Sequence, residues 1–204
     1  MRIVLSAAAA ATVIVGAVAA YATLGRPSAE QFKAVDITGV SWGHGFELTD
    51  HHGKTRRLED FHGKAVLLFF GYTGCPDVCP TTLALLAGAM KELGPDADKV
   101  KGLFVTVDPK RDTPQLLAQY VPAFYPTFLA LYGDEATTER TVREFRGYYH
   151  ANGPNDHGSY TVDHSGQIYV FDPAGRIRLL VQPAAATPES IVHDLRMLLN
   201  EAAG

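Results

Sequence analysis

The chain has 204 residues, a formal net charge of −4 and only two cysteines. About 170 residues follow its apolar N-terminus, which is the usual size of a single domain with a sizeable core. The small net charge, without any block of basic residues, argues against nucleic acid as a partner, and two cysteines are too few for a disulfide scaffold.

Residues 1–25 are predicted to form a membrane anchor or a signal segment. No charged residue occurs from Ile3 to Leu24, and a helix of that length, roughly 33 Å, crosses a bilayer. We expect an uncleaved anchor; the alternative is a signal segment cleaved near residues 20–22. Arg2 favours a cytoplasmic N-terminus, so the domain is expected to face the periplasm from a bacterial inner membrane. Residues 26–38 are the predicted linker.

Residues 39–204 are predicted to form one α/β domain. A β-hairpin opens it, with strands from Phe46 to Leu48 and from Thr55 to Leu58 around turn-prone residues 50–53. Five apolar runs then have the length and composition of buried strands: residues 65–70, 102–107, 127–132, 168–171 and 177–181.

Helical patterns separate the first three of these strands and follow the last. Residues 81–93 carry apolar side chains at helical spacing, and Thr113 and Thr187 each precede a proline, as an N-cap precedes the first helical position. The turn sequence from Asp172 to Gly175 predicts that the last two strands form an antiparallel hairpin. The order βαβαβ followed by ββα is that of a thioredoxin-like fold.

The two cysteines lie in GYTGCPDVCP, residues 71–80, after the first core strand and before the next helix. Ligands of α/β sheets usually bind at this end of a strand, and a helix N-terminus favours a thiolate. Because residues four apart in a helical turn share a face, Cys75 and Cys79 can point to one centre; a redox dithiol more often has two intervening residues. Pro80 must lie near the first turn, so an irregular turn is expected.

His164 is the histidine whose position suits a third ligand. Seven of the eight histidines lie in turns, beside glycines, in a polar stretch or in an amphipathic helix, where a surface or packing role is the ordinary interpretation. His164, in YTVDHSGQIYVF, precedes the strand at residues 168–171. Thioredoxin-like sheets fold this segment back beside the loop that carries the cysteines.

Three motifs carry a resemblance to a known family: FFGYTGCPDVCPTTL, VTVDPKRDTP and YTVDHSGQIYVFDPAG. Together, and in this order, they resemble the Sco/SenC family of copper-handling proteins, tethered thioredoxin-fold domains that assist assembly of the binuclear copper site of cytochrome c oxidase. Lys110 stands where the family more often has an acidic residue, and Gly166-Gln167 replaces a commoner apolar pair.

The resemblance implies that Cys75, Cys79 and His164 bind copper and that Asp108 lies beside the site, in contact with bound metal or with a partner. It also implies delivery of copper to the copper-bearing subunit of cytochrome c oxidase. Other periplasmic copper carriers and thiol reductants are further expected partners. Chemically, two thiolates and one imidazole suit Cu(I) or Cu(II), whereas a structural zinc site normally has a fourth protein ligand.

The main alternative is an enzyme, a membrane-tethered periplasmic thiol–disulfide oxidoreductase that keeps target cysteines reduced with Cys75 and Cys79. His164 distinguishes the two functions, because copper binding requires a third ligand and dithiol exchange does not. A disulfide between the cysteines would remove both anionic ligands, so oxidation and copper binding should exclude each other. An inert structural disulfide would explain neither the loop position nor His164, and a peroxidase would need proline at position 68 and threonine at position 72, where Leu68 and Tyr72 stand.

The aspartates of DPKRDTP also have ordinary structural interpretations. Asp108 precedes a proline and suits the end of a strand, and Asp112 or Thr113 is expected to cap the following helix. Arg111 is placed to pair with either carboxylate. Tyr72 and Tyr160 are expected to serve packing rather than chemistry.

Overall fold

The structure is a computed structural model that describes residues 31–154 and 159–202. The predicted anchor or signal segment, residues 1–25, lies outside these ranges. Within them, no helix has both the length and the apolar character needed to cross a membrane.

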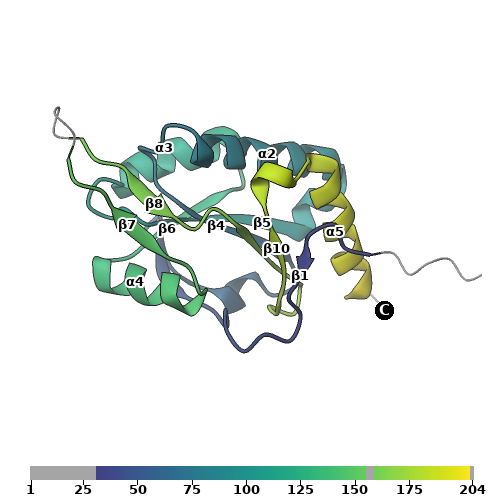
Figure 1. Ribbon diagram of the computed structural model, residues 1–204. Coiled ribbons are helices and arrows are strands. Elements are labelled where there is room, and N and C mark those ends of the chain that lie inside the picture. The colour runs from purple at the N-terminus through teal and green to yellow at the C-terminus, as the bar shows by residue number, and fades with distance from the viewer. Residues whose placement is uncertain (1–30, 155–158, 203–204) are drawn as a thin grey trace, which may run out of the picture. The chain divides into compact units, whose positions relative to one another are not determined.

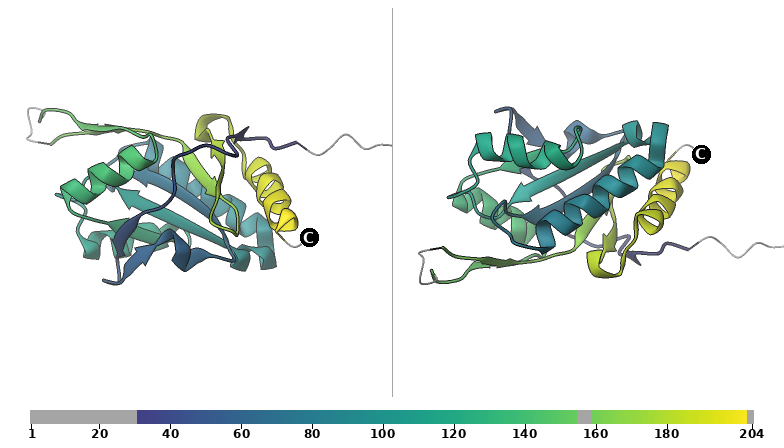
Figure 2. Two further views of the ribbon diagram at one scale, coloured as in Figure 1. Left: turned by 90° about the horizontal axis from the view of Figure 1, so that it is seen from below. Right: turned by 90° about the horizontal axis from the view of Figure 1, so that it is seen from above.

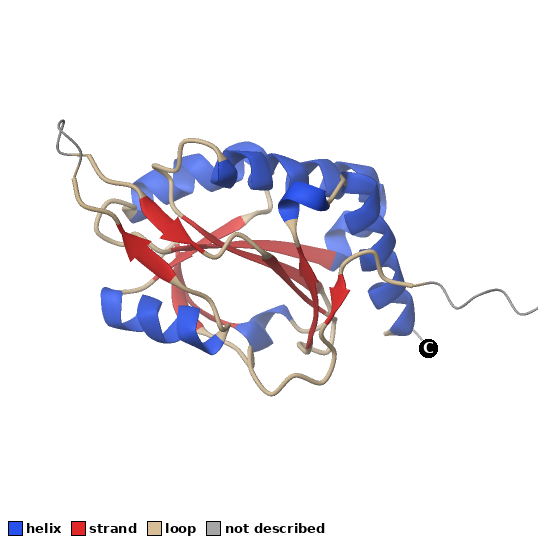
Figure 3. Ribbon diagram, viewed as in Figure 1, coloured by secondary structure: helices blue, strands red, loops and turns tan. Residues whose placement is uncertain are grey.

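The described part of the chain has an α/β fold built on a mixed β-sheet with helices packed against it (Figures 1 and 3). Its eight strands lie in the order β1-β10-β9-β4-β5-β6-β2-β3. The strands are β1 (Val35–Asp36), β2 (Glu47–Asp50), β3 (Thr55–Arg57), β4 (Ala65–Gly71), β5 (Val100–Thr106), β6 (Leu129–Tyr132), β9 (Ile168–Phe171) and β10 (Ile177–Val181). The α-helices are α2 (Val78–Leu93), α3 (Pro114–Phe124), α4 (Glu135–Glu144) and α5 (Pro188–Glu201).

The centre of the sheet is parallel and covered on both faces. β4, β5 and β6 run parallel, and β9 pairs antiparallel with β4 on the other side. Because the crossovers through α2 and α3 both move along the sheet in one direction, these helices lie on the same face, whereas α4 lies on the opposite face (Figures 1 and 2). All seven residues of β4 are therefore buried, which explains the unbroken apolar run at residues 65–70.

The predicted core elements are confirmed. The five expected strands correspond to β4, β5, β6, β9 and β10, and the last two form the predicted antiparallel hairpin. Thr113 and Thr187 are the N-caps of α3 and α5, with side chains that accept hydrogen bonds from the first turn. The N-terminal hairpin of β2 and β3 is also present. β2 also pairs with β6 and so extends the main sheet.

Three parts of the fold were not predicted. β1 lies within the predicted linker and pairs with β10. α4 begins after the N-cap Asp134 and buries mainly two threonines and Val142, so it lacks an apolar stripe. β7 (Tyr149–Ala151) and β8 (Val162–His164) form a separate two-stranded ribbon, which extends past the main sheet (Figure 2).

Candidate metal centre

The cysteine loop, residues 71–80, leaves the C-terminal end of β4 and enters α2. The helix begins at Val78 rather than at residue 81, with Asp77 as its N-cap, so Cys79 lies in the first turn and Cys75 precedes the helix. Cys75 therefore lies outside the helix, in the irregular turn expected from Pro80, and the two sulfurs still point to one centre as predicted. The backbone N–H of Cys79 donates to Sγ of Cys75 at 3.4 Å, using a donor that has no acceptor inside the helix. Pro80 is tolerated because it lies in the same first turn.

Cys79 is fully buried below the loop. Burial raises the pKa of its thiol well above the ordinary value, so the thiol is protonated when no metal is bound. Its Sγ lies 3.4 Å from Nε2 of His164. The space around the sulfur is tight, since a Cβ added at Gly71 would lie 2.9 Å from it and 2.7 Å from Phe104. A glycine at the end of β4 is thus needed for the close approach of Cys79.

His164 is the last residue of β8, not a residue of the loop before β9, and it lies opposite Tyr149 in the ribbon. Nδ1 lies 3.0 Å from the carbonyl oxygen of Ser165. Because a carbonyl only accepts, Nδ1 carries the proton and Nε2 keeps its lone pair. Burial lowers the pKa of His164, which favours the neutral ring. Edge contacts with Phe69 and Tyr72 orient the imidazole.

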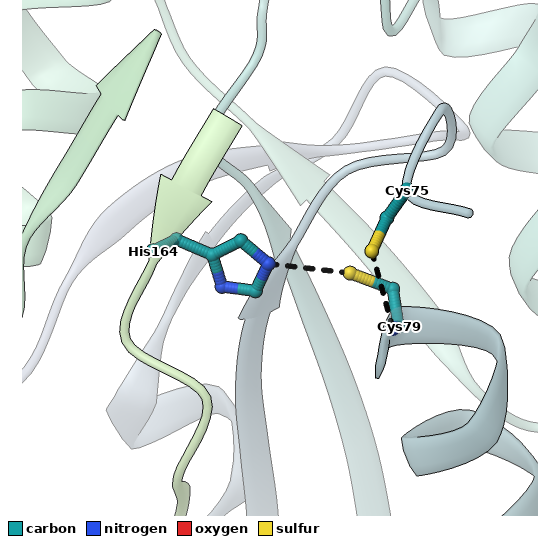
Figure 4. Close-up of side chains that lie close together, drawn as sticks. All are labelled: Cys75, Cys79 and His164. Carbon is teal, nitrogen blue, oxygen red and sulfur yellow. Dashed lines mark hydrogen bonds between the residues drawn. The ribbon is translucent and has the colours of Figure 1, made fainter. Parts of the chain in front are cut away.

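The three residues predicted to bind metal converge on one point (Figure 4). The two Sγ atoms and one imidazole nitrogen lie within 4.8 Å of one another, and both cysteines are free thiols. Within residues 31–154 and 159–202, this is the only group of three or more histidine, cysteine or acidic residues arranged in this way. Soft sulfur ligands with one imidazole favour Cu(I) or a tetragonal Cu(II) over hard cations such as Mg²⁺.

An open groove of about 480 Å³ leads to the ligands. Cys75 and His164 line it, together with side chains from the cysteine loop and from the ribbon. Two of its lining residues are unusually exposed for apolar or aromatic side chains, Val78 at 49% and Tyr148 at 62%. The centre is therefore accessible from solvent at Cys75 and closed at Cys79.

Asp108 lies outside the ligand cluster. It is 4% exposed, and its two carboxylate oxygens accept hydrogen bonds from Tyr160, at 2.8 Å, and from Nε of Arg111. Tyr160, expected only to pack, therefore holds this carboxylate. Arg111 pairs with Asp108, as one of the two partners proposed for it.

Asp112 has a role that the sequence analysis missed. Thr113, not Asp112, caps α3. The buried carboxylate of Asp112 accepts hydrogen bonds from the backbone N–H of Thr73, at 3.1 Å, and from the hydroxyls of Thr73 and Thr106. It thus joins the cysteine loop to the end of β5, although burial raises the pKa of its carboxyl group. Only the threonine at position 73, two residues before Cys75, offered a signal for this contact.

Fold and site together define a thioredoxin-like domain with a two-sulfur, one-nitrogen ligand set at the start of the helix after its first core strand. The family model described as SCO1/SenC matches residues 36–200. The chain belongs to this family.

Three comparisons show the range of its relatives. The mitochondrial SCO2 homolog of Bos taurus is 40% identical over 149 residues, which are 72% of this chain and 56% of the bovine protein. The SCO2-like protein RP587 of Rickettsia prowazekii is 36% identical over 74% of each chain. The structure of Bradyrhizobium japonicum ScoI with copper bound is 39% identical, with a TM-score of 0.71 over 78% of this chain and 99% of ScoI. The chain thus spans little more than half the length of the bovine relative.

Proposed function

We propose that this protein binds copper through Cys75, Cys79 and His164 and delivers it to the binuclear copper site of cytochrome c oxidase. The observation that carries the proposal is the convergence of three soft ligand atoms within 4.8 Å at the end of an open groove. The copper-bound ScoI structure, which shares the fold at 39% identity, supports the choice of metal. The oxidase as recipient rests on the resemblance of the three sequence motifs to the Sco/SenC family.

The arrangement suits a carrier better than a structural site. A structural zinc site normally has four protein ligands, whereas the described residues supply three here, beside a groove that gives an incoming ligand access to Cys75. Copper must displace the proton of the buried Cys79 thiol, so binding releases a proton. Oxidation of the two thiols to a disulfide would remove both anionic ligands and release the metal.

The orientation of His164 favours this function over simple thiol–disulfide exchange. Its free Nε2 faces the sulfur of Cys79, as metal binding requires, and its Nδ1 is held by the Ser165 carbonyl in the manner typical of metal-binding histidines. Cys79 is buried and protonated, which makes it a poor attacking thiol. Any dithiol chemistry would therefore begin at the half-exposed Cys75.

In this proposal the N-terminal segment anchors the domain to the bacterial inner membrane, with the metal centre in the periplasm. The partners are the copper-bearing subunit of the oxidase, which receives the metal, and periplasmic copper carriers or thiol reductants, which load the site or keep it reduced. The apolar character of residues 3–24 supports the anchor.

The first test is an anaerobic Cu(I) titration of the reduced full chain in detergent, in competition with a chromophoric chelator. We expect one tight equivalent for the wild type and, for His164→Ala, a loss of affinity at least as large as the roughly 10- to 100-fold that follows loss of an outer-shell partner. His150→Ala is the matched control, because His150 lines the same groove outside the ligand cluster. If the wild type and His164→Ala bind equally weakly, the copper function is wrong and dithiol exchange takes its place.

Delivery needs a separate measurement. The copper-loaded chain is mixed with the reduced soluble domain of the copper-bearing oxidase subunit, the two are separated, and the copper in each is counted. Transfer from the wild type, and none from a chain first oxidised to the disulfide, is the expected result. Copper that stays with the chain in the presence of excess acceptor would contradict delivery.

A further inference from the structure

The β7–β8 ribbon raises the question of what places His164 against the cysteines. β8 pairs only with β7 within the described residues, so no hydrogen bond of the main sheet fixes its position. Cys75, by contrast, lies between β4 and α2, and Cys79 lies in the first turn of α2; both elements belong to the domain core, which fixes the positions of the two cysteines. The third ligand therefore depends on side-chain contacts between the ribbon and the rest of the domain.

Three residues form a connected set of contacts next to β8: Asp108, Arg111 and Tyr160, which we call the arginine clamp. The Tyr160 hydroxyl donates to one oxygen of Asp108 at 2.8 Å, and Nε of Arg111 donates to the other. Nη1 of Arg111 donates to the carbonyl oxygen of Tyr160 at 2.7 Å. The guanidinium also stacks on the Tyr160 ring, 3.6 Å from its centroid. Three contacts thus bind the chain just before β8 to the loop after β5, and the Arg111–Asp108 pair braces that loop from within.

The clamp also reaches the cysteine loop. The guanidinium of Arg111 lies 5.5 Å from the centroid of the Tyr72 ring. The Tyr72 hydroxyl accepts a hydrogen bond from the backbone N–H of Val162 in β8, at 3.2 Å, and the Tyr72 ring meets the edge of the His164 ring. Arg111 therefore contacts both segments whose separation sets the distance between His164 and Cys79.

Most of the Arg111 side chain is buried, so its role is to contact neighbouring residues rather than to present a charge to solvent. Its side chain is only 32% exposed, and Nη2 is buried without a hydrogen-bond partner among the described residues. Its neighbour Lys110 is exposed and pairs with Glu135 on α4. The two basic residues of DPKRDTP thus have different partners: removing Lys110 breaks an ion pair with α4, whereas removing Arg111 breaks a hydrogen bond to the chain before β8.

We propose that Arg111 is a positioning residue for the metal centre: the arginine clamp holds the ribbon so that His164 meets the two sulfurs. This inference rests on the proposed copper function. It assigns to Asp108 an indirect part in the site, through Arg111 and Tyr160, in place of contact with metal or partner. The forked contact to a carboxylate and a carbonyl, with stacking on an aromatic ring, needs a guanidinium, so lysine should not replace it.

The test measures Cu(I) affinity of the full chain for Arg111→Ala, His164→Ala and the double variant, with Lys110→Ala as the matched control. We expect Arg111→Ala to lose about 10- to 100-fold, as changes behind metal ligands do, and to add no further loss in the His164→Ala background. Arg111→Lys should behave like Arg111→Ala, and Lys110→Ala like the wild type. Full affinity in Arg111→Ala or Arg111→Lys, or an equal added loss in the double variant, would overturn the proposal.

A spectroscopic readout separates positioning from general damage. In the Cu(II)-loaded chain, the electron paramagnetic resonance coupling to the His164 nitrogen should weaken in Arg111→Ala, while the reduction potential of the dithiol stays unchanged. If Arg111→Ala does not fold, Tyr160→Phe removes only the hydroxyl contact to Asp108 and should still weaken both affinity and coupling. An unchanged coupling in whichever variant folds would overturn the proposal.

The same data distinguish this proposal from the copper function. If His164→Ala binds Cu(I) as the wild type does, the ligand set itself is wrong. If His164→Ala loses affinity and Arg111→Ala does not, the copper site stands and only the clamp is wrong.

Discussion

The cysteine loop and the β7–β8 ribbon bring ligands to the same centre, but they are held by different means. The loop continues β4, whose residues are all buried, and leads into α2, so its position follows from the core of the domain. The ribbon lies outside the main sheet and is held by the arginine clamp and by Tyr72. The thiols are thus placed by the core of the domain, whereas the imidazole is placed by a few polar contacts, by its edge contacts with Phe69 and Tyr72 and by the burial of Val162.

The same difference predicts which of the two regions moves more easily away from the metal centre. Opening the ribbon costs a small number of hydrogen bonds, each worth about 1 kcal/mol net, and the burial of Val162, while moving the loop disturbs the central sheet. Loss of His164 from the centre should therefore precede loss of the thiols. Three substitutions test this difference, from the largest expected effect on copper binding to the smallest.

Gly71→Ala should affect the loop most strongly. The new Cβ would lie 2.7 Å from Phe104 and 2.9 Å from the sulfur of Cys79, so the sheet or the thiol must move. Overpacking of this kind costs about 1–3 kcal/mol of unfolding free energy. We expect this loss in chemical denaturation, together with a loss of Cu(I) affinity and a changed dithiol reduction potential.

The control for this prediction is Gly166→Ala, between β8 and β9, where an added Cβ meets nothing within 4 Å. Stability and Cu(I) affinity should remain at wild-type levels. Wild-type affinity in Gly71→Ala would show that the thiol is not confined by the core, and the contrast between the two regions would fail.

Tyr72→Phe should act on the ribbon alone. The substitution keeps the ring against His164 but removes the hydroxyl that accepts the hydrogen bond from Val162 N–H. Losing about 1 kcal/mol of the contact that positions His164 corresponds to about a fivefold loss of Cu(I) affinity. The dithiol reduction potential should not change, and a shift in that potential would mean that Tyr72 acts on the loop instead.

Asp172→Asn should leave copper binding unchanged. Asp172 follows β9 beside the start of β4, at the opposite end of that strand from the cysteine loop. Burial alone would raise the pKa of Asp172, but hydrogen bonds from Arg176 and the contacts with Arg178 outweigh burial, and the pKa is lowered. Substitution of this carboxylate should therefore change the stability of the main sheet but not the metal centre.

The lowered pKa gives Asp172 a pH signature. Its stabilising effect is complete above the unfolded-state pKa of about 3.9 and is lost as the pH falls through the lower folded-state pKa. Asp172→Asn should flatten the acid side of the stability curve in urea unfolding between pH 7 and 3. The exposed Asp98→Asn should keep the wild-type slope. A change in Cu(I) affinity at neutral pH in Asp172→Asn would contradict the separation of sheet and site.

The sequence predicted the central elements of the fold because their burial is complete. A strand covered on both faces is an unbroken apolar run, as at residues 65–70, and proline after threonine marks the start of α3 and α5. α4 gave no such signal, since it buries two threonines and a single valine. β7 and β8 are three residues each, and their pairing joins segments that no local pattern connects.

By itself, the sequence predicted the candidate ligand set and its chemical softness, because Cys75 and Cys79 stand out by residue type and spacing and His164 by its position and motif. It also determined which strand carries the thiols. Only the tertiary structure decided that α2 begins before Cys79, that Asp112 ties the cysteine loop to β5, and that Arg111 and Tyr160 hold the ribbon. These contacts join residues up to 52 positions apart through side-chain geometry, and that geometry arises only when the whole chain has folded.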